Sequence, residues 1–386
     1  MPEQLWRVRG LDPLLFRDGK PFSAEKSGLS ASSMLLPMPG TLAGCVRTRV
    51  GNLSGRDWSQ PGKGAVSVAG PLLTYNADVQ FAVPADALIY QDDNHNRHVI
   101  CLRPAAIGEG EGCDLPGRNL VPLEITEDVK PERGNLLWSA ADTFRWMAHG
   151  HEPGFEAPPA SGGLPVDERV HVGIKQDTGC SDDGMLFTTT STGFEDYHKI
   201  LDYKIGAQLD SDTGYAFWEL LVRVGDSTDL KGVQPFGGER RLAVFTPAQG
   251  TEWPAMPLNV ANELRDATRV RMQLATPAIF ARGWKPSWLD ANMQGTPPGC
   301  DGVTLQLVSA AALRREPVSG WDFREGKSSP KRLRFTVPAG SVYFFEVITG
   351  SAEALVSLWL QPVSDSPFDR NDGYGLALWS AWQHTN

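Results

Sequence analysis

The sequence predicts an α+β fold in which helices lie on one face of antiparallel sheets. Short β-rich runs alternate with single amphipathic helices in both halves of the 386 residues. Forty glycines and 29 prolines occur without a repeat period, which is typical of many ordered turns and long loops. A chain of this length suggests about two domains. We place the domains at 1–205 and 206–386.

The first half contains two predicted helices between short strands. The first is expected from Gly40 and Thr41, directly after a proline, because apolar residues then recur at i, i+4, i+8 and i+11. This stripe consists of Leu42, Val46, Val50 and Leu53. The other segments are a strand at 4–10, a Gly/Ser/Pro-rich loop at 11–39, two strands at 66–83 broken at Asn76, an irregular stretch at 86–134 and a helix at 138–149 ended by Gly150.

A long β-hairpin is predicted at 166–192. Two β-rich runs, 166–174 and 185–190, flank a polar tip, and this pattern is typical of a hairpin with an extended loop. The hairpin is the main insertion expected in the first domain.

The second half repeats the alternation of strands and single helices. Helices are expected at 260–267 and 351–360, the latter with Ser351 as its N-cap. A glycine turn at 236–241 leads into a strand, and a second glycine turn at 373–375 opens the last one. The expected strands are 215–224, 242–245, 270–275, 303–313, 332–337, 341–348 and 374–382.

The charge of the chain is acidic overall but unevenly distributed. The formal net charge is −10, which disfavours a free-standing nucleic-acid binder with a basic footprint. Basic residues nevertheless predominate at 17–49, 265–285 and 314–334, whereas acidic residues predominate at 109–132 and 177–212. The basic stretches fit either contacts with an RNA backbone or ordinary solvated faces.

Composition favours a cytoplasmic protein. No apolar run approaches the roughly 18 residues of a membrane span, and the N-terminus has no apolar signal region. The five cysteines are far apart and form no C-x-x-C pair, which indicates a reducing compartment without a disulfide framework or zinc ribbon.

No motif for a cofactor or a metal stands out. Gly326-Lys327-Ser328 resembles the end of a phosphate-binding loop, but Trp321 stands where the first glycine is required. His149 with His151, and His95 with His98, are either metal ligands or surface and capping histidines. We therefore expect neither a cofactor nor a bound metal.

Several stretches in order resemble one family. They are Leu11–Phe22 (LDPLLFRDGKPF), Leu36–Arg47 (LPMPGTLAGCVR), Glu168–Ile174 with Leu186 and Phe187, Phe236–Arg241 (FGGERR), Thr276–Phe280, Gly320 with Trp321, and Val337–Glu346 (VPAGSVYFFE). The set, running from about residue 5 to 382, resembles the RAMP (repeat-associated) protein that is the third subunit of type III-B CRISPR Cmr effector complexes, which act in antiviral defence.

The resemblance implies two ferredoxin-like (RRM-like) domains side by side, with long loop and hairpin insertions. It implies a subunit without catalytic activity that holds the 5′ repeat-derived tag of the crRNA. The expected protein partners are the large polymerase-like Cmr subunit and the neighbouring backbone RAMP subunit. The hairpin at 166–192 is then the candidate for a thumb that pushes on the guide at the tag boundary.

The residues expected to contact RNA combine cations with glycine turns. A sheet platform holds single-stranded RNA through backbone amides, Arg/Lys and stacking, and a helix N-terminus favours an anion. Glycines let one backbone approach another closely. The candidates are Arg17, Lys20, Lys26, Gly40, Thr41, Arg47, Arg49, Arg169, Lys175, Gly237, Gly238, Arg240, Arg241, Arg282, Lys285, Gly373 and Gly375.

Three alternatives remain open at this point. Glu239, Arg240 and Arg241 could form an internal ion-pair network instead of an RNA contact. The chain could be a standalone endoribonuclease that processes repeat RNA with a histidine as general base. It could also be a structural bridge that touches no RNA. If RNA binding occurs, the acidic total predicts weak binding by the isolated chain and an affinity that falls with salt.

Overall fold

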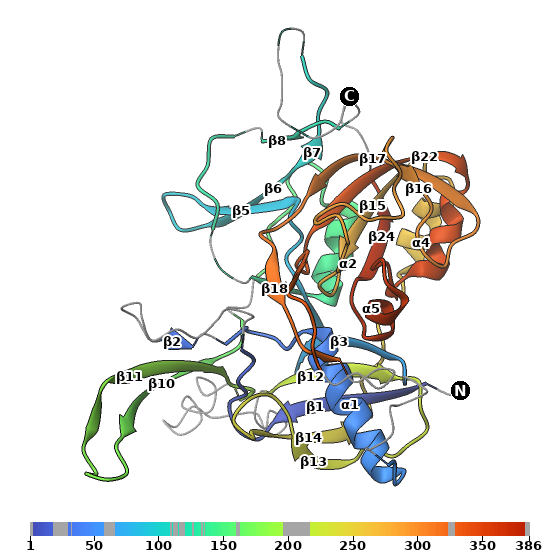
Figure 1. Ribbon diagram of the computed structural model, residues 1–386. Coiled ribbons are helices and arrows are strands. Elements are labelled where there is room, and N and C mark those ends of the chain that lie inside the picture. The colour runs from blue at the N-terminus through green and yellow to red at the C-terminus, as the bar shows by residue number, and fades with distance from the viewer. Residues whose placement is uncertain are drawn as a thin grey trace, which may run out of the picture. The chain divides into compact units, whose positions relative to one another are not determined.

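The computed structural model describes residues 3–17, 30–31, 33–57, 66–108, 110, 115, 120–125, 127–132, 134, 136–159, 163–195, 217–322 and 329–382. The fold is α+β, as predicted, with mostly antiparallel strands and few helices (Figure 1). Among the helices of the described residues, none is long and apolar enough to cross a membrane.

The chain forms two compact units that each collect separate stretches of sequence. Unit 1 consists of residues 1–77, 164–252 and 317–334, and unit 2 of 78–163, 253–316 and 335–386. The predicted domain boundary near residue 206 lies in the segment 196–216, outside the described residues, and the units take segments from both sides of it. The division at 206 stays a prediction.

Unit 1 is built on an antiparallel sheet in the order β13-β14-β1-β12-β3. Its strands are β1 (Gln4–Gly10), β3 (Val68–Tyr75), β12 (Trp218–Val224), β13 (Gly232–Pro235) and β14 (Leu242–Pro247). Helix α1 (Pro39–Leu53) packs on β3 through the predicted apolar stripe, of which Leu42 and Val46 are fully buried. The break predicted at Asn76 is confirmed by its positive φ of 50°.

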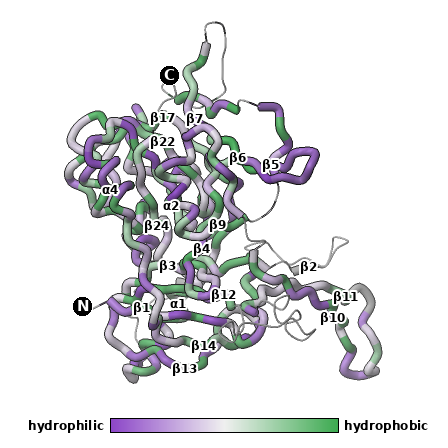
Figure 2. Tube along the Cα trace, turned by 180° about the vertical axis from the view of Figure 1, so that it is seen from behind, coloured by the Kyte–Doolittle hydropathy of each residue, from purple (hydrophilic) through white to green (hydrophobic). Residues whose placement is uncertain are grey.

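The predicted hairpin is confirmed in unit 1. Strand β10 (Val166–Ile174) pairs antiparallel with β11 (Ser181–Thr192), so the tip is shorter than expected. The short strand β2 (Ser30–Ala31) runs parallel to β11. Figures 1 and 2 show the hairpin extending away from the sheet of its unit. A second, shorter pair consists of β19 (Trp321–Asp322) and β20 (Ser329–Pro330).

Unit 2 is built on a second antiparallel sheet, in the order β16-β17-β22-β15-β24-β23. These strands are β15 (Arg269–Leu274), β16 (Gln294–Gly295), β17 (Val303–Ala311), β22 (Val342–Gly350), β23 (Gln361–Pro362) and β24 (Leu376–Ala381). Helices α2 (Ala140–His149) and α4 (Leu258–Arg265) and the 3-10 helix η2 (Ala352–Leu358) pack against β24. The smaller elements are β4 (Asp78–Ala82), β5 (Ala87–Gln91), β6 (Arg97–Cys101), β7 (Arg103–Pro104), β8 (Leu123–Glu124), β9 (Leu137–Ser139) and α5 (Pro367–Asn371).

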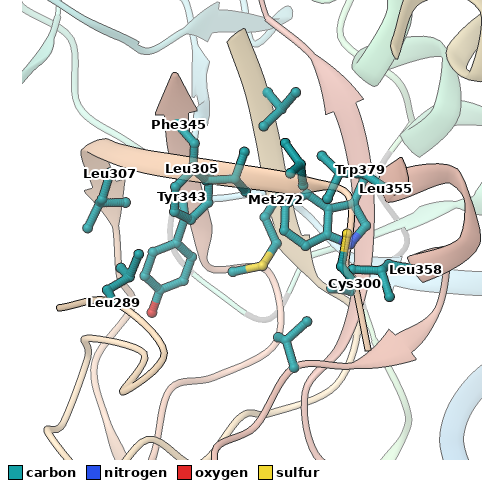
Figure 3. Close-up of a cluster of buried hydrophobic side chains, with 14 of the residues drawn as sticks. Met272, Leu289, Cys300, Leu305, Leu307, Tyr343, Phe345, Leu355, Leu358 and Trp379 are labelled. Atoms are coloured by element: carbon teal, nitrogen blue, oxygen red, sulfur yellow. The ribbon is translucent and has the colours of Figure 1, made fainter. Parts of the chain in front are cut away.

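The core of unit 2 lies between this sheet and its helices. Met272, Tyr343 and Trp379 stand on neighbouring strands and are fully buried together (Figure 3). Leu355 of η2 closes the cluster. The division between the units falls within β18 (Glu316–Val318) and β21 (Arg334–Thr336).

Four strands in each unit share one spatial order. The order across the sheet is β14-β1-β12-β3 in unit 1 and β24-β15-β22-β17 in unit 2, and every adjacent pair is antiparallel. If the four strands of each unit are numbered along the chain, both orders read 4-1-3-2. A ferredoxin-like unit also needs a helix after its first and after its third strand. Among the described residues each unit has only one of these two crossovers helical, so the complete ferredoxin-like pattern is not confirmed.

Two local predictions need correction. The stretch 86–134, predicted to be irregular, contains the hairpin β5–β6, because Asp92 Oδ1 accepts the backbone N–H groups of Asn94 and Asn96 at 2.9 and 2.8 Å and so closes its polar tip. The segment predicted as a helix at 351–360 is a 3-10 helix, although Ser351 caps it as expected by accepting from Glu353 N at 3.2 Å.

Cys45 of α1 is half-buried beside the edge strand β13. The Gln234 amide donates to its Sγ at 3.1 Å. Burial raises the pKa of Cys45 to about 12, against a smaller opposite effect of Arg49. Because the thiolate is the reactive form of cysteine, the raised pKa predicts a slow reaction of Cys45 with alkylating reagents at neutral pH.

Alkylation should therefore separate two cysteines of unit 1. With iodoacetamide at pH 8 we expect Cys180, exposed near the tip of the hairpin, to react, and Cys45 to react only after denaturation. Peptide mass spectrometry before and after urea measures both. If Cys45 were labelled as fast as Cys180 in the folded chain, the result would contradict this packing of α1 on β13.

Candidate nucleic-acid interface

The glycine turn at 236–241 lies against the segment that follows β1. Gly238 N–H donates to the carbonyl oxygen of Leu15 at 2.7 Å, and the rings of Phe16 and Phe236 meet edge to face at 5.2 Å. A Cβ on Gly237 would lie 2.8 Å from the Leu15 oxygen. Gly237 is thus required for a close approach within the protein, a reason that sequence reasoning had not supplied.

The turn has an unusual backbone. Phe236 N–H donates to the Arg241 carbonyl at 2.8 Å and closes it. Glu239 and Arg240 have φ of 54° and 56°, the left-handed region that residues with a β-carbon rarely adopt, and they do so in succession. Strained backbone of this kind tends to persist at functional sites, where the surrounding structure holds it in place.

Two exposed arginines stand on these adjoining segments. Arg240 is exposed on the turn, and Arg17 is exposed two residues beyond Leu15, where its backbone bridges to Ser33. Neither forms an ion pair with another described residue, whereas Arg241 lies 3.5 Å from Glu239. The internal ion-pair alternative therefore fits Arg241 and leaves Arg240 exposed. Lys20 and Lys26 lie outside the described residues.

The candidates on α1 divide into two kinds. Gly40 and Thr41 stand in its first turn, which has no side-chain cap. Arg47 Nε donates to the Val66 carbonyl at 3.0 Å and Arg49 Nη2 to the Lys231 carbonyl at 2.8 Å. Both arginines thus tie the helix to the rest of unit 1.

The candidates on the hairpin are exposed but paired. Arg169 lies 2.7 Å from Asp167, and Lys175 lies 3.6 Å from Asp182. Between them, the ring of His171 stacks on Phe187 at 5.1 Å. Exposed ion pairs of this kind are weak, so a polyanion could displace the carboxylates.

In unit 2 the candidates have different surroundings. Arg282 is exposed, but Lys285 is buried and its ammonium donates to the Asp290 carbonyl. Gly373 and Gly375 are buried: the Gly373 carbonyl accepts from Thr276 at 2.8 Å, and a Cβ on Gly375 would lie 2.9 Å from the backbone N of residue 364. This glycine turn is explained by packing within the unit.

One residue missed by sequence reasoning positions Arg282. Asp365 accepts the backbone N–H of Ala281 at 2.7 Å and that of Ser287 at 2.8 Å, one on each carboxylate oxygen. It therefore fixes both ends of the loop that carries Arg282. The partners are about 80 positions apart in sequence, and no local pattern signals the contact.

The histidines form no metal centre in the part of the chain that the structure describes. His149 Nδ1 lies 2.8 Å from Glu152, and His98 Nε2 lies 3.0 Å from Asp92. Within those residues there is no group of three or more His, Cys, Asp or Glu side chains that could hold a metal ion.

The fold and the exposed residues together describe an α+β protein with two antiparallel sheets and with arginines on a glycine turn. The chain belongs to the family of CRISPR-associated proteins described as Cas_Cmr3, whose sequence model matches residues 6–382. The resemblance stated from the sequence is thereby confirmed. No curated protein matches the chain.

Two similar solved structures are chains of a type III-B Cmr-beta complex studied by cryo-electron microscopy. One complex is bound to cognate target RNA and AMPPnP; its chain has a TM-score of 0.42 and 12% identity, with 88% of this chain and 86% of that chain covered. The other is bound to cognate target RNA, with a TM-score of 0.41, 13% identity and the same coverages. A similarity at this level assigns no function to an individual residue.

Proposed function

We propose that this chain is the subunit of a type III-B Cmr effector complex that holds the 5′ repeat-derived tag of the crRNA. The observation that carries the proposal is the turn Phe236–Arg241, anchored on Leu15 and presenting the exposed Arg240 beside the segment of Arg17. Family membership supports a role in a CRISPR complex. Arginine side chains commonly contact nucleic-acid phosphates through charge-assisted hydrogen bonds.

The remaining parts of the molecule fit the same role. Each unit has the strand order of a ferredoxin-like sheet, a common platform for single-stranded RNA. The projecting hairpin β10–β11 serves as a thumb at the tag boundary. The subunit contributes no catalytic group, and it docks on the large polymerase-like subunit and on the neighbouring backbone RAMP subunit.

The test is tag recognition in the assembled complex. We reconstitute the chain with its large-subunit partner and compare binding of a 5′-tagged guide with that of a guide whose tag is scrambled. Tighter binding of the tagged guide is expected, without cleavage. Equal affinity for both guides would overturn tag recognition, and specific cleavage of repeat RNA that is lost on a single His→Ala substitution would favour the endoribonuclease.

The R17A/R240A double variant tests the site itself. We expect the affinity for tagged guide to fall about tenfold. The slope of log affinity against log salt should become shallower by about 1.4, since two phosphate contacts on a single strand are removed. The matched control is R265A, which removes an exposed arginine paired with Glu353 in unit 2 and should leave binding unchanged.

A further inference from the structure

Trp321 differs from the other tryptophans of the molecule. The residue is 50% exposed on the short strand β19, whereas every other tryptophan that the structure describes is buried or half-buried. Opposite it in the antiparallel register stands Pro330, also exposed. Half of the Trp321 surface is thus exposed, on a strand whose register is fixed by its pairing with β20.

Two basic residues, Lys331 and Arg332, directly follow the strand that pairs with Trp321. Lys331 N–H donates to the Gly320 carbonyl at 2.8 Å, and its Cδ would lie 3.7 Å from a Cβ on Gly320, so the lysine stem lies beside the residue that precedes the tryptophan. Arg332 is exposed. Neither Lys331 nor Arg332 forms an ion pair with another described residue.

The segment is basic within an acidic chain. Residues 317–334 contain five Lys or Arg against two Asp or Glu, while the whole chain has a net charge of −10. An exposed aromatic ring flanked by unpaired cations is the combination that binds single-stranded nucleic acid, because a base stacks on the ring while the cations contact its phosphates. Trp and Arg are also common in protein–protein interfaces, so the observation that favours RNA is the excess of positive charge within an acidic chain.

We propose that Trp321, with Lys331 and Arg332, is a second binding site for single-stranded RNA, separate in sequence from the turn at 236–241. One base stacks on Trp321, and the adjacent phosphates contact the two cations. The inference rests on the proposed function, in that the RNA is the one held by this subunit. It adds a stacking contact that reads no base identity, since every base offers an aromatic face.

The test uses the assembled complex with its guide RNA. We expect W321A to weaken guide binding at least about fivefold and W321F to retain most of the affinity. Ultraviolet crosslinking of the wild-type complex should give an RNA adduct on the peptide that contains Trp321. The matched control is F368A, which removes an aromatic side chain of similar exposure next to the acidic residue Asp369.

The outcomes separate this inference from the proposed function. Unchanged guide binding by W321A, together with no adduct at Trp321, overturns the inference, and so does a W321A chain that loses its protein partners when RNA is absent. If R17A/R240A leaves guide binding unchanged while W321A weakens it, the site proposed at the turn is wrong and the stacking site stands. If the reverse is found, only the stacking site is wrong.

Discussion

Replacing Arg271 by methionine is expected to lower the free energy of unfolding by about 3–5 kcal/mol, the cost of leaving one partner of a buried ion pair alone. Arg271 of β15 is 4% exposed and contacts Asp86 with two guanidinium nitrogens, the Nη2–Oδ1 distance being 2.7 Å. The carboxylate also accepts from Trp146 Nε1 at 3.3 Å. Removal of the guanidinium leaves the Asp86 carboxylate buried in unit 2 without its positively charged partner.

Urea denaturation of the full chain measures the effect. The control is R265M, whose exposed ion pair with Glu353 should contribute less than about 1 kcal/mol. The double variant D86L/R271M should recover much of the loss, because neither charge then remains buried. A loss below 1 kcal/mol for R271M would show that water reaches Asp86, contrary to the burial described.

The second large effect is expected for Gly237→Ala. The residue has a φ of 85°, and its Cβ would lie 2.8 Å from the Leu15 oxygen, so the variant combines backbone strain with a collision between backbones. We expect a loss of about 2–4 kcal/mol in the free energy of unfolding. Gly250→Ala is the control, since its φ is 75° but nothing lies within 4 Å of the new Cβ, and it should cost about 1 kcal/mol.

Guide binding then distinguishes the effect of the position of Arg240 from the effect of its charge. If the turn positions Arg240, the G237A complex should bind the tagged guide more weakly although every cation is retained. R240A should weaken binding without changing stability, because its side chain is exposed and unpaired among the described residues. Equal stability losses for G237A and G250A would mean that the turn is not held by Leu15.

Local sequence patterns predicted those helices and strands that depend on residues close together in the chain. The Ser351 cap and the two runs of the hairpin β10–β11 are short-range signals, and both are confirmed. The apolar stripe of α1 is confirmed at Leu42 and Val46, whereas Leu53 is exposed. The hairpin β5–β6 was missed because its turn depends on Asp92 accepting two backbone N–H groups within an otherwise polar run.

The site was less accessible to prediction, because burial and long-range contacts decide which cations are available. The sequence ranked Lys285 with Arg282, but the structure buries the lysine and exposes the arginine. It proposed the glycines at 237–238, yet not their contact with Leu15, more than 200 positions away. No sequence pattern indicated that Trp321 is exposed, whereas the other tryptophans that the structure describes are buried or half-buried.

The interleaved course of the chain has a consequence for its biosynthesis. Trp6 of β1 pairs with Val222 on one side and with Pro247 on the other. The first strand made therefore has neither partner until the ribosome has synthesised more than half of the protein, and it has both only after about two thirds. Until then its apolar face is left for chaperones to cover. A nascent chain halted at residue 205 lacks β12 and β14, and we expect proteases to degrade it readily.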